Sequence, residues 1–455
     1  MIHTRRAIAI NAPPPGAPSA RALLGRALID DAFLRNPYPT YRALREAAPL
    51  VWSDEFFGGA WLVSRHADVE GVLRDARFSA QRTGGWVMRS DDSRTELRGF
   101  QRLFARAMIF LDAPDHARVR QVMSAAFRPT DLQRLAPRIE QAVSDRLDAV
   151  DIRRPFDFVS ALARPLPAQV IAMLMGMDDT EDDQPSEIVD WSDELAAFIG
   201  APAPSLAQAL SAQTALLAMA RHFESLLARR RAGLESDGHR NEPARDDVIG
   251  RLLQAECLGQ IRGSAELLAQ CVMLLFAGHE TTRHLLANGL RTLLAHPALC
   301  QRLRREPALL PDAVRELLRY DSPVQYTGRR VACDLTLHGQ ALRRGDLVVV
   351  LIGAANRDPA RHERPDELDI ARGPGAPLAF GKGPHACIGA ALTLMEAQTV
   401  FAQVLERWPD LALVQPDTAC GTASPLYRGL TELPLRVRGV GGSVTGPAYT
   451  AASPA

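Results

Sequence analysis

The sequence predicts a mainly α-helical protein with a smaller region of β-sheet. Apolar residues recur three or four positions apart through most of the 455 residues, as they do in amphipathic helices. Strand-like runs are fewer and short. The chain is 47% hydrophobic and has 53 basic and 53 acidic residues. It is therefore long enough to bury a large core, and its zero net charge does not favour a nucleic acid partner.

Seven segments have helical periodicity, and four have the pattern of strands. The expected helices are Tyr41–Ala48, His66–Arg74, Ala117–Phe127, Thr130–Val150, Leu206–Ala232, Ala265–Ala295 and Pro311–Arg319. The expected strands are Leu50–Ser53 and Ala60–Ser64, which flank a Phe-Gly-Gly turn, and Leu335–His338 and Leu347–Leu351, which flank a Gly-Asp turn. The charged segment Gly233–Asp247 breaks the period, so we expect a surface loop there.

The two ends of the chain differ in composition from the rest. Residues 1–35 are rich in proline, and residues 439–455 are mostly small residues and glycine. We expect a partly disordered N-terminal extension over 1–35, one domain over 36–438 and a disordered tail over 439–455. The apolar run Cys271–Gly278 is too short to span a bilayer, and the N-terminus lacks the apolar core of a signal peptide. The six cysteines are scattered and show no disulfide or zinc spacing, so we expect a cytoplasmic protein without membrane attachment.

Cys387 has the most informative surroundings of any residue. It lies in residues 380–389, which read Phe-Gly-Lys-Gly-Pro-His-Ala-Cys-Ile-Gly, directly before a helical pattern over Ile388–Val400. A helix N-terminus stabilises a thiolate. Gly381 and Gly383 permit positive φ, and Gly389 leaves room for a flat cofactor beside the backbone. A lone cysteine is more often a buried apolar residue than a metal ligand, but here the ten-residue pattern closely resembles the haem-binding loop of the cytochrome P-450 family.

That resemblance implies the cytochrome P-450 fold from roughly Asn36 to Arg438. It implies haem b as the cofactor, with the thiolate of Cys387 as the iron ligand and Phe380 shielding the sulfur. The implied activity is that of a soluble, bacterial-type class I monooxygenase, which inserts one atom of O2 into a hydrophobic small molecule. Two alternatives stay open on the same haem: peroxide-driven or redox-neutral chemistry, and a haem-binding module without turnover.

A second constellation lies in the expected helix Ala265–Ala295, where Ala277 and Gly278 precede an acid and an alcohol, Glu280 and Thr281. Glycine inside a helix costs about 1 kcal/mol, so it often marks a close approach or a distortion. Threonine on a helix commonly bonds back to the preceding turn, but a carboxylate after a buried apolar run suggests proton transfer. By resemblance, this motif opens a groove over the haem, Glu280 supplies protons, and Thr281 holds bound oxygen and its water. Thr282 has a weaker claim to that role.

In the same motif we expect His279 to be a packing or surface residue.

Haem has two propionates, which need cations when they are buried. His116 and Arg120 lie four residues apart on one helical face, where they could hold one carboxylate, and the family uses the same motif. Arg329 and His385 are further candidates. Arg330 is the rival of Arg329, and the spacing to the Gly339 turn favours Arg329, which precedes a strand region over Val331–Gly339.

Glu316 and Arg319 are three residues apart and can form a bidentate pair on one helical face. Their position between the other two motifs resembles the structural ion pair of the family. The family commonly adds a third, cationic partner, but Glu367 stands at the corresponding place here. We expect either a direct pair between Glu367 and Arg319 or a contribution from Arg364.

No Gly-x-Gly-x-x-Gly motif follows a strand, so the chain has no sign of a flavin or nicotinamide domain. The resemblance therefore implies a separate ferredoxin and ferredoxin reductase. Four basic residues are the expected contacts on the surface near Cys387, namely Arg118, Arg120, Arg128 and Lys382.

The resemblance also places a largely apolar substrate pocket along five segments, which are Arg82–Phe100, Trp191–Leu210, Leu275–Ala277, Val324–Thr327 and Ser424–Tyr427. Their apolar members are Trp86, Val87, Phe198, Leu275, Phe276, Ala277, Val324, Tyr326 and Leu426.

Overall fold

The computed structural model describes residues 14–82, 97–177, 185–202, 204–236, 247–373, 375, 377–415, 421 and 424–439. Several predictions lie outside these residues. They concern the first 13 residues, Trp86 and Val87, most of the expected loop over Gly233–Asp247, and the tail from residue 440.

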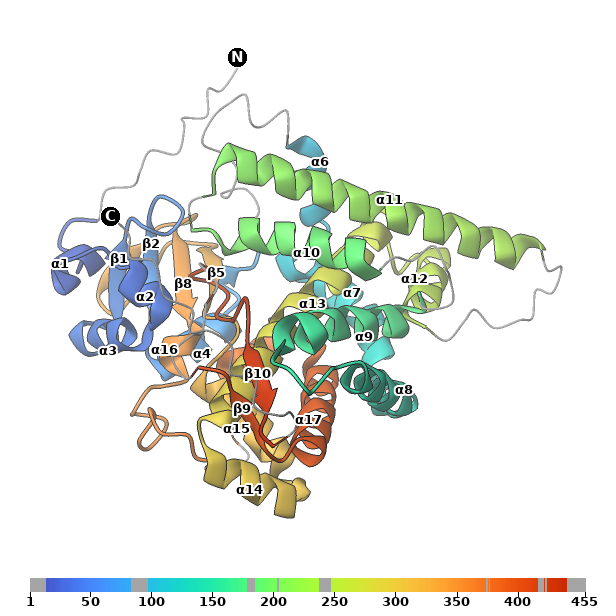
Figure 1. The fold of residues 1–455 in the computed structure, drawn as a ribbon. Coiled ribbons are helices and arrows are strands. Elements are labelled where there is room, and N and C mark those ends of the chain that lie inside the picture. Colours follow the sequence, from blue (N-terminus) through green and yellow to red (C-terminus); the bar gives the residue numbers. More distant parts are fainter. Residues whose placement is uncertain are drawn as a thin grey trace.

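Most of the described chain is helical (Figure 1). The helices are α1 (Ala20–Leu24), α2 (Asp31–Arg35), α3 (Tyr38–Ala47), α4 (His66–Arg74), α6 (Arg98–Phe104), α7 (Asp115–Ser124), α8 (Pro129–Asp148), α9 (Pro165–Met175), α10 (Pro185–Gly200), α11 (Leu206–Ser236), α12 (Val248–Cys257), α13 (Ser264–Leu294), α14 (Pro297–Arg305), α15 (Leu310–Tyr320), α16 (Ile352–Ala355) and α17 (Ala390–Arg407). The strands are β1 (Leu50–Ser53), β2 (Ala60–Val63), β3 (Phe78–Ser79), β4 (Phe156–Asp157), β5 (Tyr326–Val331), β6 (Leu335–Leu337), β7 (Gln340–Leu342), β8 (Leu347–Leu351), β9 (Leu411–Leu413) and β10 (Pro434–Val437). The predicted fold class, mainly α with a smaller sheet, is confirmed.

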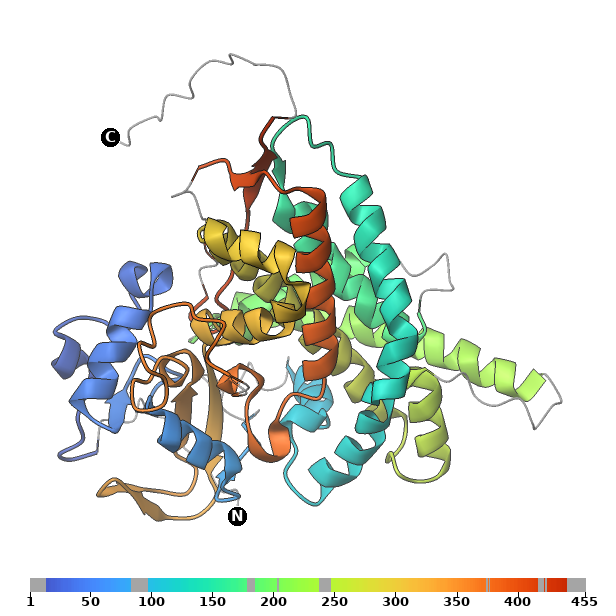
Figure 2. The ribbon, with the colours of Figure 1, turned by 90° about the horizontal axis from the view of Figure 1, so that it is seen from below.

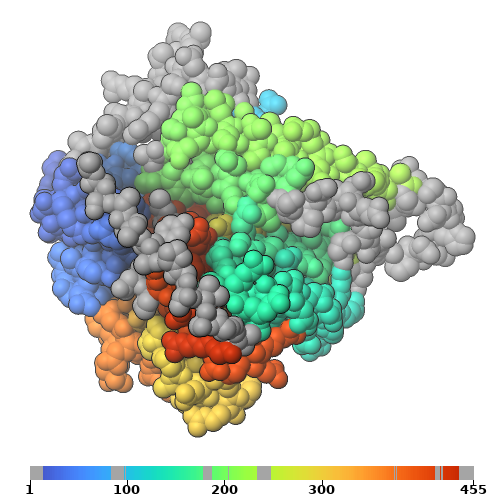
Figure 3. All heavy atoms as spheres, in the orientation of Figure 1, coloured from blue at the N-terminus to red at the C-terminus, as the bar shows by residue number. Residues whose placement is uncertain are grey.

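The largest sheet has the strand order β1-β2-β8-β5-β3. Only the β2–β8 pair is parallel, with Leu62 opposite Val349. In Figure 1 this sheet lies to one side with α1 to α4, and the long helices occupy the other side. Figure 2 shows α17, in red, and α8, in teal, side by side. Figure 3 shows the N-terminal elements in blue next to segments of the C-terminal third in orange, so distant parts of the chain close the domain together.

Helix α13 runs through the helical part and packs against α9, α10, α11 and α17. Its bounds differ by only one residue at each end from the predicted Ala265–Ala295. The prediction came this close because a helix that is buried along most of its length has a long, uninterrupted apolar pattern. Gly278 permits the close approach of α9. A Cβ built on Gly278 would lie 2.3 Å from Cδ1 of Ile171, so no larger residue fits without movement of Ile171.

Two parts of the structure differ from the sequence prediction. Arg329 was expected to precede a strand region over Val331–Gly339, but it lies inside β5. The sequence Tyr326–Val331 did not predict this strand, because two consecutive arginines interrupt the alternation of apolar and polar residues. Residues 14–35 were expected to belong to an extension, yet they include α1 and α2. Leu28 and Phe33 are buried in the same core as the rest of the domain.

Glu316 and Arg319 form the expected bidentate pair inside the protein. Nε and Nη2 of Arg319 donate to the two carboxylate oxygens of Glu316, each at 2.7 Å, and both side chains are buried. The third partner is Arg372, whose Nε donates to Oε1 of Glu316 at 3.1 Å. Neither expectation for this place was correct: Glu367 accepts from Arg319 only through its backbone oxygen, and the Arg364 side chain pairs with the Glu367 carboxylate.

Loss of Arg372 should destabilise the protein more than loss of Arg364. Arg372→Gln removes one of two cations from a buried carboxylate, and we expect it to lower the free energy of unfolding by about 1 to 3 kcal/mol. Arg364→Gln removes an exposed pair and should cost less than about 1 kcal/mol. Denaturant unfolding of the two variants measures both, and equal costs would contradict the assignment of Arg372 as the third partner.

Candidate active site

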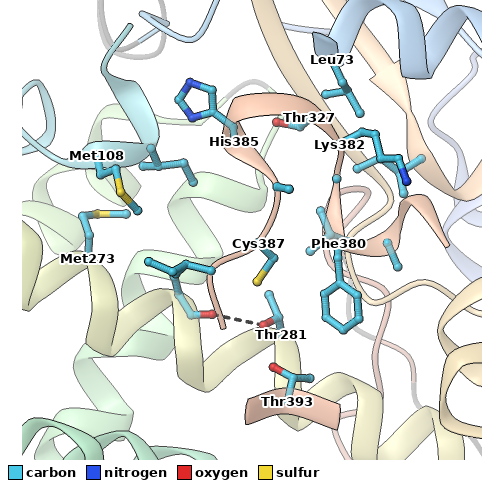
Figure 4. Close-up of a pocket in the computed structure, with 18 of the residues that line it drawn as sticks. Leu73, Met108, Met273, Thr281, Thr327, Phe380, Lys382, His385, Cys387 and Thr393 are labelled. Carbon is cyan, nitrogen blue, oxygen red and sulfur yellow. Dashed lines mark hydrogen bonds between the residues drawn. The ribbon is translucent and has the colours of Figure 1, made fainter. Parts of the chain in front are cut away.

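A cavity of about 290 Å³ lies between α13, the loop of residues 380–389 and strand β5 (Figure 4). Most of its wall is apolar, and the side chains that form this part include Leu73, Met108, Ile109, Met123, Met273, Leu274, Ala277, Leu285, Val324, Ile352 and Phe380. Cys387 points into the cavity from its loop, and Thr281 faces the same space from α13.

The loop before Cys387 is shaped by glycine. Gly381 and Gly383 have φ values of 68° and 72°, and a Cβ on Gly383 would lie 2.7 Å from the backbone oxygen of Leu73. Only glycine fits such a position without strain. The amide of Cys387 donates to the oxygen of Phe380 at 2.7 Å, which closes the turn and fixes the direction of the cysteine side chain.

The surroundings of the Cys387 thiol act on its pKa in both directions. Burial raises the pKa, whereas the backbone N–H groups of Gly389 and Ala390 and the charge of Arg120 oppose that rise. Helix α17 begins at Ala390, so these N–H groups belong to its unpaired first turn. Burial outweighs these groups and the pKa of the thiol is raised overall, so the sulfur is oriented toward the cavity and loses its proton when it binds a metal ion.

Thr281 lines the cavity, and its hydroxyl donates to the backbone oxygen of Ala277 at 3.1 Å. This is the ordinary bond of a helical threonine to the preceding turn, and α13 continues through it without interruption. The expected groove beside Gly278 is therefore not a feature of this helix as described. Thr282 makes the same kind of bond, to Gly278.

Glu280 is buried but does not stand among the residues that line the cavity. Its Oε1 lies 2.8 Å from Nε2 of His284, and its Oε2 lies 3.6 Å from Arg283. Burial alone would raise the pKa of Glu280, but His284, Arg283 and His279 outweigh burial and lower it to about 2. Glu280 is therefore ionised and held by ion pairs on the side of α13 away from the cavity wall.

His279 is fully buried, and its Nε2 lies 2.9 Å from the backbone oxygen of Arg164. It packs between α13 and the start of α9.

The cavity brings together the four side chains that were expected to bind propionates. His116 and Arg120 both line it from α7, and Arg329 from β5 and His385 from the cysteine loop line it with them. The rings of His116 and His385 have centroids 3.9 Å apart. Arg120 donates to the oxygen of Ala386 at 2.6 Å. Arg330 does not line the described cavity and donates to Gly345.

These four groups have few anions near them, and the two arginines are their charged members. Burial lowers the pKa of Arg329 to about 10, and burial together with surrounding cations, led by His116, lowers that of His385 to about 3. No aspartate or glutamate is among the described residues that line the cavity. Since a buried cation without a counter-ion is costly, the site fits a largely apolar ligand that has more than one carboxylate. Haem, with its two propionates, is such a ligand.

The family model for Cytochrome P450 matches residues 87–411. The chain belongs to the cytochrome P450 family. It is 37% identical over 412 residues to Cytochrome P450 107B1 of Saccharopolyspora erythraea, covering 90% of this chain and 96% of that one. It is 34% identical to Cytochrome P450 monooxygenase PikC of Streptomyces venezuelae, covering 93% and 96%.

A solved structure agrees with this membership. The crystal structure of P450BioI in complex with a hexadec-9Z-enoic acid ligated acyl carrier protein has a TM-score of 0.79 and 32% identity, covering 90% of this chain and all of that one. The chain is thus a P450 oxidoreductase of the bacterial monooxygenase family, whose members bind haem through a cysteine thiolate. In the described part of the chain, no helix has the length and apolar composition to cross a membrane.

The wall of the cavity differs in part from the predicted substrate pocket. Of the expected residues, Arg82, Ala277, Val324 and Thr327 line it, whereas Phe198, Leu275, Phe276, Tyr326 and Leu426 are buried without being among its described lining. The lining residues outside the expected segments include Met108, Ile109, Met273, Leu274 and Ile352, which follow no motif.

Replacement of Arg329 should weaken retention of the cofactor. Arg329→Met removes a buried cation of the cavity, so we expect haem transfer to apomyoglobin to become roughly tenfold faster. Arg330→Met is the matched control, since it removes the same charge one residue away from the cavity wall, and it should leave the rate unchanged. Equal rates for the two variants would contradict the role of Arg329.

Proposed function

We propose that this chain is a haem-thiolate monooxygenase that inserts one atom of O2 into a hydrophobic small molecule. The observation that carries the proposal is the arrangement of a single cavity. It has one oriented thiol at Cys387, a hydroxyl at Thr281 on the facing helix, uncompensated cations at one end and an apolar wall between them.

Haem b, when bound, supplies the activation of O2. Cys387 would be its iron ligand, with Phe380 beside the sulfur and Gly389 leaving space next to it. The propionates would be bound by His116, Arg120, Arg329 and His385.

Protons would reach the cavity through α13. A series of ion pairs connects Asp190 at the surface to Glu280: Arg164 joins Asp190 and Asp193 at 2.7 and 2.8 Å, and Arg283 joins Asp193 and Glu280 at 2.8 and 3.6 Å. In the proposed route, Glu280, which its low pKa keeps ionised, accepts a proton only transiently and releases it at once, and Thr281 passes it on by exchanging its bond to Ala277 for one to a water in the cavity.

Electrons would come from a separate ferredoxin and its reductase. Two of the four expected contacts are engaged elsewhere. Arg118 pairs with Glu266 at 2.7 Å, and Arg120 faces the cavity. The docking surface near Cys387 is therefore proposed around exposed Arg128 and around Lys382, which lines the cavity but is half-buried and can reach water.

The substrate is proposed to be an apolar molecule of specialised metabolism, such as a polyketide, terpenoid, peptide or fatty acyl compound. The apolar wall supports this class, as does the acyl group that accompanies P450BioI in its solved structure.

The first test is the identity of the thiolate ligand. The purified chain should bind haem and give the thiolate-type spectrum of its ferrous carbon monoxide complex, and it should oxidise a substrate with NADPH, ferredoxin and reductase. Cys387→Ala should lose that spectrum and the turnover, because it removes the sulfur. Cys271→Ala is the control, since Cys271 is fully buried in the core. A thiolate-type spectrum that persists in Cys387→Ala would contradict the proposal.

Thr281→Ala tests the proton route. The variant should keep its haem but form several-fold less product per NADPH consumed, because no hydroxyl at position 281 passes protons to the cavity in the proposed order. The electrons that do not form product should be released as hydrogen peroxide. Thr282→Ala, which removes a hydroxyl of the same kind beside it, should stay coupled. Unchanged coupling in Thr281→Ala would exclude this route. Turnover driven equally well by hydrogen peroxide without NADPH would favour the peroxide-driven alternative, and haem binding without turnover would favour a binding module.

A further inference from the structure

Arg82 is a third guanidinium at the cavity, and like Arg329 it is buried, whereas Arg120 is half-buried. It is 9% exposed, and its stem packs against β5, where a Cβ built on Gly328 would lie 3.4 Å from Cδ of Arg82. Its only direct hydrogen bond among the described residues is a long one, 3.4 Å from Nη1 to the oxygen of Gly328. Its guanidinium carbon lies 5.0 Å from the ring centroid of Phe110. No carboxylate of the described chain forms an ion pair with it.

The charges of the cavity do not balance when only haem is considered. Three guanidinium groups line the described cavity, those of Arg82, Arg120 and Arg329, and no acidic side chain does. The two propionates neutralise two of them, which leaves one. Lys382 adds a further charge, but it is half-buried and can reach water. Among the described residues, one buried cation therefore still has no anion.

Arg82 lies beside Arg329, since both donate to the oxygen of Gly328, and its charge acts on His385, but it also reaches the apolar wall. Arg120 donates to Ala386 in the cysteine loop and acts on the Cys387 thiol. Arg82 instead lies beside Phe110, which shares a short 3-10 helix with Met108 and Ile109 of the apolar wall. Burial and the charge of Arg329 lower the pKa of Arg82 to about 9, whereas the charge of Tyr427 acts to raise it. The centroid of the Tyr427 ring lies 6.1 Å from that of His284, a residue of α13.

We propose that Arg82 binds a carboxylate of the substrate, so that the enzyme acts on an amphiphilic acid with an apolar body. This rests on the proposed function, because the apolar body would lie along the wall between Arg82 and the haem. A guanidinium suits the task, since its planar donors match a carboxylate in a bidentate pair. The haem propionates are the other source of carboxylate in this cavity, and the experiment distinguishes the two.

The test compares dodecanoic acid with dodecan-1-ol, which share chain length and differ in charge. Their dissociation constants are measured by spin-state titration of the haem-bound protein. The wild type should bind the acid about 10- to 100-fold more tightly than the alcohol. Arg82→Met should lose this preference by weakening the acid alone, and Arg82→Lys should keep part of it. Arg330→Met, with the same change of charge outside the described cavity wall, should keep all of it.

Three results would overturn the proposal. Equal affinities for acid and alcohol in the wild type would show that no anion site exists. Equal weakening of both ligands in Arg82→Met would mean that Arg82 only packs. Loss of haem from both Arg82→Met and Arg82→Lys would make Arg82 a propionate partner. The proposed function fails separately, since a wild type without the thiolate-type spectrum fails before any ligand is added.

Discussion

Positive charge that is buried without acidic partners is the constraint on which this site depends. The guanidinium groups at the cavity lie on three separated segments of chain, on α7, on β5 and after β3. Each loses hydration on folding, and no described acidic side chain in the wall repays that loss. A ligand with carboxylates is the natural partner, so its binding free energy is also folding free energy for these segments. Elsewhere the protein does pair its buried charges, as Glu316 does with Arg319 and Arg372.

Helix α13 has two different environments on its two sides, and neighbouring residues of the sequence lie in different ones. Glu280 and Thr281 are neighbours, yet successive residues of a helix differ in direction by about 100°. Thr281 therefore faces the cavity, and Glu280 points toward His284 and Arg283. The acid is ionised in a polar cluster, and the alcohol stands in an apolar wall. Any proton that passes between them must cross the helix by movement of a side chain or a water.

The sequence was informative where the structure is local or periodic. The long apolar period of α13 predicted its bounds to within one residue, and the glycine pattern predicted positive φ at Gly381 and Gly383. Contacts between distant segments were not predictable in this way. Arg372 reaches Glu316 across 56 positions from an irregular segment, so no periodicity relates the two. Gly278 could signal either a groove or a close contact, and only the position of Ile171 decides in favour of the contact.

The guanidinium that the propionates leave unpaired would also orient a substrate in the cavity. Arg120 is the guanidinium that acts on the Cys387 thiol, whereas Arg82 lies with Phe110 at the apolar wall. A ligand whose carboxylate is held at Arg82 must extend its apolar body along Met108 and Met273 to approach the haem. The carbon that is oxidised would then be distant from the acid group. The ion pair at the acid end of the substrate and the apolar contacts along its chain thus determine which carbon reaches the haem. No specific contact to that carbon is needed.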